Sequence, residues 1–345
     1  MIEQAVVDQF PGAPGYLNTA SIGLPPQQAV DALHAAVTKW QDGRAQAPEY
    51  DEVVTSAREA FAALVGAPVE TVAVGSQVSA LVAMVATALR PGAHVLVPEG
   101  EFTSVIFPFL VRDDLPLTVE AVPLGQLAAA IRPEVDLVAF SAVQSSNGAV
   151  ADLSAIKTAA ESNDVITMVD ATQAAGWLPL DATDFDFVVV GAYKWLLSPR
   201  GTAFMTVRPA MLEKTRPLFA GWYAGESVWE SIYGMPLRLA SSARRLDLSP
   251  GWLAWVGTAP ALQLVNAVGV AAIHGHNVGL ANALLAELDL PAADSAIVSL
   301  RLDPHFDERR LAGLSTAYRS GRLRVGFHLY NTTEDVARVA TAVKG

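Results

Sequence analysis

The sequence predicts an α/β protein built on a doubly wound, mainly parallel sheet. Up to about residue 209, short and wholly apolar runs rich in Val alternate with Ala-rich segments of helical periodicity. Strands that are apolar on both faces are typical of parallel sheets, because crossover helices cover each face. The chain has 345 residues, of which 52% are hydrophobic and 17% charged, so it can bury a large core, and disorder is excluded as its main state.

The elements of the predicted sheet alternate along the chain. A helix at 76–89 follows the first strand, and Pro91-Gly92 forms a turn before the second. A loop at 143–150 and a helix at 153–162 follow the third strand. The expected strands cover residues 72–74, 95–98, 137–141, 165–169 and 187–190.

The sequence changes character beyond residue 209. Residues 212–240 are rich in Trp, Tyr, Gly and Pro and show no clear period, which predicts a long ordered loop. A long helix is expected over 258–288. A small α+β unit completes the chain, with strands at 296–302 and 323–327 and helices at 308–317 and 333–343. We therefore expect a large cofactor-binding domain over 21–255 and a small C-terminal domain over 256–345 that includes residues 1–20.

Composition excludes several classes of function. The 23 basic and 35 acidic side chains give a net charge of −12, which argues against a nucleic-acid-binding surface. The chain has no cysteine, so it can form no disulfide, thiolate nucleophile, iron–sulfur cluster or Cys-ligated zinc site. Neither a signal-peptide pattern nor an apolar run of about 20 residues is found, so we expect a soluble cytoplasmic protein without a membrane partner. We also expect no nucleic-acid partner and no bound metal.

Three predicted strand ends carry polar residues, and ligands of open parallel sheets bind beyond the carboxyl ends of the strands. Asp170 ends one apolar strand and is either a buried carboxylate or a helix N-cap. Lys194 follows the next strand and is either a desolvated amine or an exposed loop lysine. The segment Gly75-Ser76-Gln77 leads into a helix and is either an anion site or an ordinary helix start.

Together, these three features meet the requirements of pyridoxal 5′-phosphate (PLP). A lysine forms a Schiff base with its aldehyde, a carboxylate keeps the pyridine nitrogen protonated, and a helix N-terminus binds the phosphate. The protonated ring stabilises a carbanion at the substrate Cα. The combination therefore predicts a PLP site more strongly than any of its parts.

The stretches around Asp170 and Lys194 closely resemble the class V aminotransferase family. The matching sequences are Val-Asp-Ala-Thr-Gln at 169–173 and Tyr-Lys-Trp-Leu-Leu-Ser-Pro-Arg-Gly at 193–201, and the resemblance extends over most of the chain. This family contains cysteine desulfurases, kynureninases and isopenicillin N epimerase-like proteins with the PLP-dependent transferase fold (fold type I). The resemblance thus implies a homodimeric PLP enzyme that acts on an amino acid.

The resemblance also implies roles for individual residues. Lys194 would be the catalytic Schiff-base lysine, Asp170 would pair with the pyridinium nitrogen, and Arg324 and Asn18 would bind the substrate α-carboxylate. Among the cofactor contacts, the resemblance implies that Gln173 bonds the phenolic oxygen and that Phe102 stacks on the ring. Ser145 stands at a further cofactor-contact position. The phosphate would be bound by Ser76, Gln77 and Tyr193, and the phosphate of the partner subunit by Thr258.

The sequence departs from the desulfurase pattern at several of these positions. Tyr193 stands where desulfurases have His, Gly191 replaces a phosphate-binding Ser, Phe102 replaces the stacking His, and Ser145 replaces an Asn. The absence of cysteine excludes a persulfide-forming desulfurase.

The reaction itself stays open at the level of the sequence. Transamination and C–S or β-elimination remain, with epimerisation of the isopenicillin N epimerase type or a non-catalytic PLP-binding protein as alternatives. A nicotinamide-dependent oxidoreductase fits the α/β pattern, but the Gly-x-Gly-x-x-Gly fingerprint is missing. The aromatic loop at 212–240 carries no net charge, which suggests a substrate side chain without strong charge.

Overall fold

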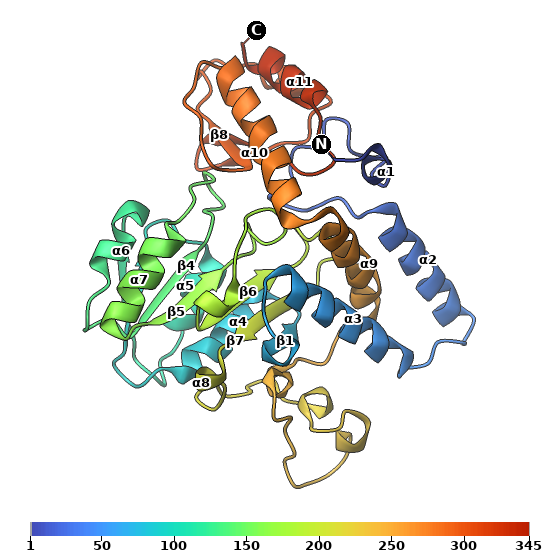
Figure 1. Cartoon of the computed structure of the whole chain (residues 1–345), viewed down its shortest axis with the longest axis vertical. Helices are drawn as coiled ribbons and strands as arrows, with labels where there is room; N and C mark the ends of the chain where they lie inside the picture. The colour runs from blue at the N-terminus through green and yellow to red at the C-terminus, as the bar shows by residue number, and fades with distance from the viewer. Residues whose placement is uncertain (1, 345) are drawn as a thin grey trace.

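A seven-stranded sheet forms the centre of the computed structural model, which describes residues 2–344 (Figure 1). The strand order is β1-β7-β6-β5-β4-β2-β3, and only β7 runs against its neighbours. The predicted doubly wound, mainly parallel sheet is therefore confirmed. Its strands are β1 (Val72–Gly75), β2 (His94–Pro98), β3 (Thr118–Val122), β4 (Leu137–Ser141), β5 (Ile166–Asp170), β6 (Phe187–Gly191) and β7 (Ala203–Val207).

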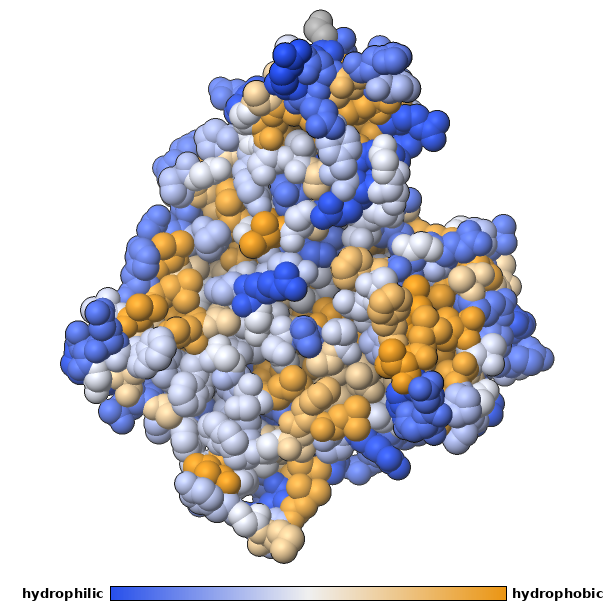
Figure 2. Space-filling model, turned by 180° about the vertical axis from the view of Figure 1, so that it is seen from behind, coloured by the Kyte–Doolittle hydropathy of each residue, from blue (hydrophilic) through white to orange (hydrophobic). Residues whose placement is uncertain are grey.

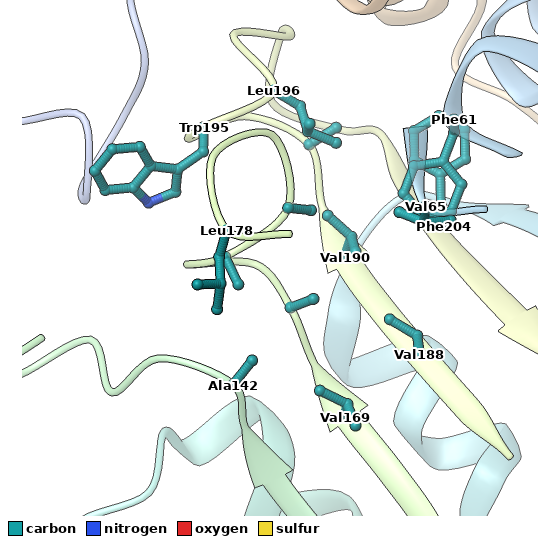
Figure 3. Packing of buried hydrophobic residues seen from close by; sticks show 14 of the residues in the cluster. Phe61, Val65, Ala142, Val169, Leu178, Val188, Val190, Trp195, Leu196 and Phe204 are labelled. Carbon is teal, nitrogen blue, oxygen red and sulfur yellow. The ribbon is translucent and has the colours of Figure 1, made fainter. Parts of the chain in front are cut away.

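Helices cover both faces of this sheet. Successive residues of each strand point to opposite faces, so Val188 and Val190 belong to one buried cluster while Phe187 and Val189 belong to the other. In Figure 3, Phe61 of α3 stacks on Phe204 of β7, with ring centroids 4.3 Å apart. The first face is covered by α3 (Glu49–Leu64), α6 (Leu127–Ala130), α7 (Leu153–Asn163) and α9 (Trp252–Val268), and the second by α4 (Val78–Val85), α5 (Thr103–Leu110) and α8 (Pro209–Leu212).

The C-terminal part forms a separate small sheet with its own apolar core. Its antiparallel strand order is β8-β10-β9. The N-terminal segment contacts this unit through bridges from Tyr16 to Ser315 and from Asn18 to Gly326. The elements are β8 (Ile297–Leu300), β9 (Ala317–Arg319), β10 (Arg322–Gly326), α10 (Val270–Glu287) and α11 (Thr333–Lys344), while α1 (Gln4–Val7) and α2 (Gln27–Gln41) precede the large sheet. The division into domains at residue 255 stays a prediction.

Two predicted helices are wrong. The helix expected over 258–288 starts earlier, at Trp252, and breaks at Gly269, where α9 and α10 meet at 81°. Gly269 has φ of +86°, a conformation that side-chain-bearing residues rarely adopt. The helix expected over 308–317 is only a short 3-10 turn (Glu308–Leu311), and the chain then passes Gly313 and enters strand β9.

The loop over 212–240 is largely irregular, as predicted, and it projects from the large sheet. It contains short 3-10 turns at Trp222–Ala224 and Trp229–Ser231. A bridge between Gly225 and Leu239 closes the projecting part, called the arm here, which lies at the bottom of Figure 1. No single helix within residues 2–344 is both long and apolar enough to cross a membrane, although the bent pair α9 and α10 meets the length and composition test together.

Candidate active site

The carboxyl ends of the central strands surround a cavity of about 270 Å³. Polar side chains from widely separated parts of the chain line it, and it opens between the start of α4, the start of α5 and the turn that joins β6 to β7. Eight of the residues predicted from the sequence line this one cavity: Ser76, Gln77, Phe102, Ser145, Asp170, Gln173, Tyr193 and Lys194.

Lys194 is a buried amine in this cavity. The side chain follows β6 in the turn before β7, and the residue is only 6% exposed. Burial lowers the pKa of its ammonium group to about 8, with Asp170 opposing this shift and three arginines adding to it. At pH 7, about one lysine in ten is then a neutral amine, compared with roughly one in 3,000 for an ordinary lysine. The exposed-lysine alternative is therefore excluded.

The next residues fix the position of this lysine. Trp195 and Leu196 point into the core beneath the turn (Figure 3). The Trp195 indole N–H donates to Oε1 of Gln173 at 2.7 Å. Gly23 lies against the other side, where an added Cβ would be 2.0 Å from the Lys194 carbonyl oxygen. The Lys194 backbone is thus held between the core and the N-terminal segment.

Asp170 ends β5 with its carboxyl group fully inside the protein. Burial raises the pKa of this carboxyl to about 6, although hydrogen bonding from Thr172 opposes the shift. Its Oδ1 accepts the Thr172 backbone N–H at 2.8 Å, and the Thr172 hydroxyl accepts the N–H of Gly191 at 2.9 Å. A buried carboxylate of this kind is stabilised by a cationic N–H partner inside the cavity.

Gln173 is anchored at both ends of its amide. Nε2 donates to the Ala20 carbonyl at 2.9 Å, while Oε1 accepts from Trp195. The second hydrogen on Nε2 remains for a ligand oxygen. The Gln173 side chain therefore connects the cavity to the N-terminal segment and to the turn that carries Lys194.

The start of α4 gives the cavity an anion-binding end. Gln77 is the N-cap in extended conformation, and no side chain caps the helix, so its first backbone N–H groups are free for a ligand. Ser76, Ser79 and Thr202 add hydroxyl groups to the same lining. An isolated sulfate- or phosphate-like group would therefore find several donors here.

Tyr193 and Arg200 lie beside this anion-binding end. A Cβ added to Gly191 would be 3.3 Å from Cε1 of Tyr193 and 3.4 Å from a methyl group of Val78, the first residue of α4. The Tyr193 ring therefore occupies the space beside Gly191. The guanidinium of Arg200 lies over the same ring, 5.2 Å from its centroid, and lines the cavity. The sequence offered no local signal for Arg200, because only the fold brings it to α4.

Phe102 forms another wall of the cavity, opposite the lysine. Its ring centroid lies 5.4 Å from Nζ of Lys194. The preceding residue, Glu101, is buried and accepts hydrogen bonds from the Phe102 N–H, the Ser141 N–H and hydroxyl, and Nε2 of Gln144. Glu101, which sequence reasoning missed, therefore fixes the start of α5 against the end of β4.

Arg324 lies behind the cavity lining rather than in it. The residue is 2% exposed, and it donates to the carbonyl of Ser145 and to the hydroxyl of Ser21. Burial, and next the charge of Arg319, lower the pKa of its guanidinium to about 10. Asn18 forms the bridge to Gly326, two residues beyond Arg324. Its buried Oδ1 has no hydrogen-bond partner within residues 2–344.

Thr258 differs in position from the other predicted cofactor contacts. The segment Gly257-Thr258 is not a loop but lies in the first half of α9, and both residues are buried. The Thr258 hydroxyl bonds the carbonyl of Ala254, at 2.9 Å, and the hydroxyl of Thr202, at 3.2 Å. It does not line the cavity of its own chain, and its hydroxyl bonds only residues of that chain within 2–344, so a contact with a partner's phosphate stays a prediction.

Comparison with known proteins identifies the family. The family described as "Aminotransferase class-V" matches residues 16–298. The chain belongs to this family. An uncharacterised aminotransferase, YcbU of Bacillus subtilis (strain 168), is 30% identical over 90% of this chain and 86% of that protein. Isopenicillin N epimerase of Streptomyces clavuligerus is 27% identical, over 95% of this chain and 93% of the epimerase.

Solved structures confirm the fold. A cystine C-S lyase bound to cysteine persulfide has a TM-score of 0.87 and 20% identity, and the match covers 97% of this chain and 99% of the lyase. The apo cysteine desulfurase of Thermococcus onnurineus NA1 has a TM-score of 0.85 and 19% identity, with 99% and 97% of the two chains covered. The protein therefore has the PLP-dependent transferase fold of type I.

The class V aminotransferase-family chain is thus a PLP-dependent enzyme, and its cavity fits that cofactor. A buried amine of lowered pKa suits the aldehyde, and a buried carboxyl without a cationic hydrogen-bond partner suits a protonated ring nitrogen. The uncapped start of α4 suits a phosphate. No group of three or more His, Cys, Asp and Glu side chains placed to hold a metal ion is found in the described part of the chain.

Proposed function

We propose that the enzyme transforms an amino acid by breaking a bond at its Cα, with Lys194 as the only base next to that carbon. The observation that carries the proposal is the buried Lys194 amine, which shares one cavity with Asp170 and the start of α4. PLP, when bound, supplies an electron-withdrawing ring that stabilises negative charge at Cα. The products are those of transamination or of β-elimination, including C–S bond cleavage.

The chain's own residues divide the work in this proposal. Lys194 would bind the aldehyde of the cofactor through its amine, and the same amine would accept and return the Cα proton. Asp170 keeps a proton on the ring nitrogen, since an anionic carboxylate in a buried site is stabilised by a cationic partner. Gln173 donates its free Nε2 hydrogen to the phenolic oxygen. Phe102 packs on the ring and excludes water from that face.

The remaining residues bind two anionic groups, the phosphate of the cofactor and the α-carboxylate of the substrate. The free N–H groups of α4, with Ser76, Gln77 and Arg200, bind the phosphate, and Tyr193 supports Arg200. Arg324 pairs with the substrate α-carboxylate, and the side-chain Nδ2 of Asn18 donates to the same group from the N-terminal segment. Ser145 contributes mainly through its carbonyl, which accepts from Arg324.

Phe102 argues against epimerisation by two bases. Such a reaction needs a proton-bearing group on each side of Cα, and the Phe102 ring carries none. Nζ of Lys194, the base that the proposal assigns, lies 5.4 Å from the centre of that ring. One-base chemistry therefore explains the replacement of the usual stacking His.

The proposal includes a homodimer. At the end of α5, whose start lines the cavity, Phe107, Leu110 and Val111 are each more than half exposed, at 56%, 56% and 70%. On the arm, Tyr233 and Met235 are 86% and 93% exposed. Figure 2 shows apolar patches on the rear face, and the arm at the bottom of that view is mostly apolar. A second copy would remove these surfaces from water. Sedimentation at micromolar concentration is expected to give twice the monomer mass.

The function is tested by following cofactor absorbance of the purified holoenzyme with single amino acids. Transamination converts the cofactor to its amine form, which a keto acid restores, whereas elimination releases keto acid and ammonia while the spectrum persists. Lys194→Ala is expected to lose turnover and borohydride labelling at this position. A Lys194→Ala protein with unchanged turnover, or a wild-type protein that borohydride cannot label, would contradict the proposal.

A further inference from the structure

A second arginine lies beside Arg324. Nη2 of Arg319 donates to Oγ of Ser21 at 3.3 Å, and Nη2 of Arg324 donates to the same oxygen at 2.7 Å. Two cationic groups therefore meet at a single hydroxyl. Their repulsion is visible in the lowered pKa of Arg324, to which the charge of Arg319 contributes after burial.

The small sheet places the two arginines together. Strands β9 and β10 are joined by Ser320-Gly321, both with positive φ, which is typical of a tight two-residue hairpin. Arg319 stands opposite Arg322 across this hairpin, and Arg324 lies two residues further along β10, so all three share one face. The Arg322 guanidinium is engaged by the hydroxyl and carbonyl of Ser299. The guanidinium of Arg319 lies instead on the side of Arg324, where both groups share the Ser21 hydroxyl.

No carboxylate among the described residues neutralises the pair. Within residues 2–344, no Asp or Glu oxygen lies within 4.0 Å of the Arg319 or Arg324 guanidinium. Acidic residues are not scarce, because the chain has 35 of them against 23 basic ones. The positive charge of Arg319 also reaches the cavity, where it helps to lower the pKa of Lys194.

Two arginines without a carboxylate partner could pair with two anionic groups of one ligand. An α-carboxylate neutralises one of the two arginines, and by the proposed function that one is the buried Arg324. Arg319, which is exposed at the hairpin end, then retains a positive charge beside Arg324, on the same Ser21 hydroxyl.

We propose that Arg319 is a specificity residue and that the substrate is an amino acid whose side chain carries a second anionic group, such as a carboxylate. This proposal rests on the function proposed above. It replaces the expectation of an uncharged side chain, which relied on the composition of residues 212–240 alone. Arg319 pairs with the side-chain anion, while Arg324 holds the α-carboxylate.

The test uses pairs of probes that differ by one charge and little in shape. Binding of L-glutamate and L-glutamine, and of L-aspartate and L-asparagine, is measured on the holoenzyme from the change in cofactor absorbance. We expect at least one acidic member to bind about tenfold more tightly than its amide. Arg319→Gln should abolish this preference and leave the Kd of the amide within about twofold of the wild-type value.

Control variants separate local pairing from general charge. Arg301→Gln removes the same charge from an exposed position in the small unit and should keep the preference. Arg319→Lys should restore part of it, since the charge returns without the planar guanidinium. Unchanged cofactor absorbance and circular dichroism would show that Arg319→Gln is folded.

Two results would overturn the assignment of Arg319. One is a wild-type enzyme with equal affinity for acid and amide in both pairs, and the other is an Arg319→Gln variant that weakens acid and amide equally. A holoenzyme whose spectrum responds to none of the four probes but to another amino acid would contradict this proposal alone, whereas a protein that borohydride cannot label at Lys194 would contradict the proposed function. The two failures are therefore distinguishable.

Discussion

Without cofactor, Lys194 is expected to destabilise the fold at neutral pH, so Lys194→Met should stabilise the apoprotein. Burial lowers the pKa of this lysine from 10.5 to about 8. Each pKa unit corresponds to about 1.4 kcal/mol, so keeping the ammonium buried at pH 7 costs about 3 kcal/mol of unfolding free energy. The increase in unfolding free energy caused by Lys194→Met is smaller than this, because Asp170 loses a positive neighbour that favours its charged form.

The sign of the pH dependence is fixed by the direction of the shift. Between pH 8 and 10.5 the unfolded state binds more protons at this lysine than the folded state, so wild-type stability rises with pH across that window. The free-energy cost of burying the Lys194 ammonium is therefore complete below pH 8 and absent above pH 10.5. The advantage of Lys194→Met should therefore be largest near pH 7 and shrink steadily toward pH 10.

Urea unfolding of the apoprotein at a fixed concentration measures the difference. Lys214→Met, which removes a charge from an exposed lysine, is the matched control and should change stability by no more than about 0.5 kcal/mol. A Lys194→Met apoprotein that is less stable than wild type at pH 7 would refute the reasoning. An advantage that is the same at pH 7 and pH 10 would do so as well.

Three other substitutions give separate tests. Arg324→Ala should raise KM for amino acids by about a hundredfold while the cofactor spectrum stays unchanged, because a bidentate charged pair is lost, and an unaltered KM would exclude its role. Arg200→Gln should weaken PLP binding to the apoprotein but leave the Kd of pyridoxal, which has no phosphate, unchanged; equal losses for both would place Arg200 elsewhere. Arg58→Met should lower the unfolding free energy by about 3–5 kcal/mol in urea titrations, because it leaves the carboxylate of Asp247 buried without its bidentate partner, and a loss below about 1 kcal/mol would show that this pair is dispensable.

The sequence predicts the strands of the sheet and the residues at their ends well, for a physical reason. A buried parallel strand is wholly apolar, so the first polar residue after it, such as Asp170, is conspicuous and lies at the ligand-binding edge. Strand β3 is less visible because it lies at the sheet edge and is only partly buried. Strand β7 was not expected, although it is apolar and buried, because it follows the lysine turn directly without a helix between.

Tertiary contacts decide what the sequence leaves open. Arg200 and Arg319 have no distinguishing local pattern, and their importance follows only from the Tyr193 ring and from Ser21, which the fold brings next to them. Thr258 shows the opposite case. Its motif resembles a loop of the family, yet the structure places it in α9, which begins at Trp252, and its hydroxyl bonds residues of its own chain.

Two departures from the desulfurase pattern, Gly191 and Tyr193, depend on each other. A side chain at 191 would be about as close to the Tyr193 ring as atoms can pack, because even a Cβ would lie 3.3 Å from Cε1. Glycine at this position therefore makes room for the tyrosine, and the tyrosine in turn provides the face on which Arg200 rests. In the proposed function, the guanidinium of Arg200 would take the place of the hydroxyl ligand that the desulfurase pattern has at 191, and it is a stronger partner for a phosphate. The apparent loss of one phosphate contact is thus consistent with full retention of cofactor binding.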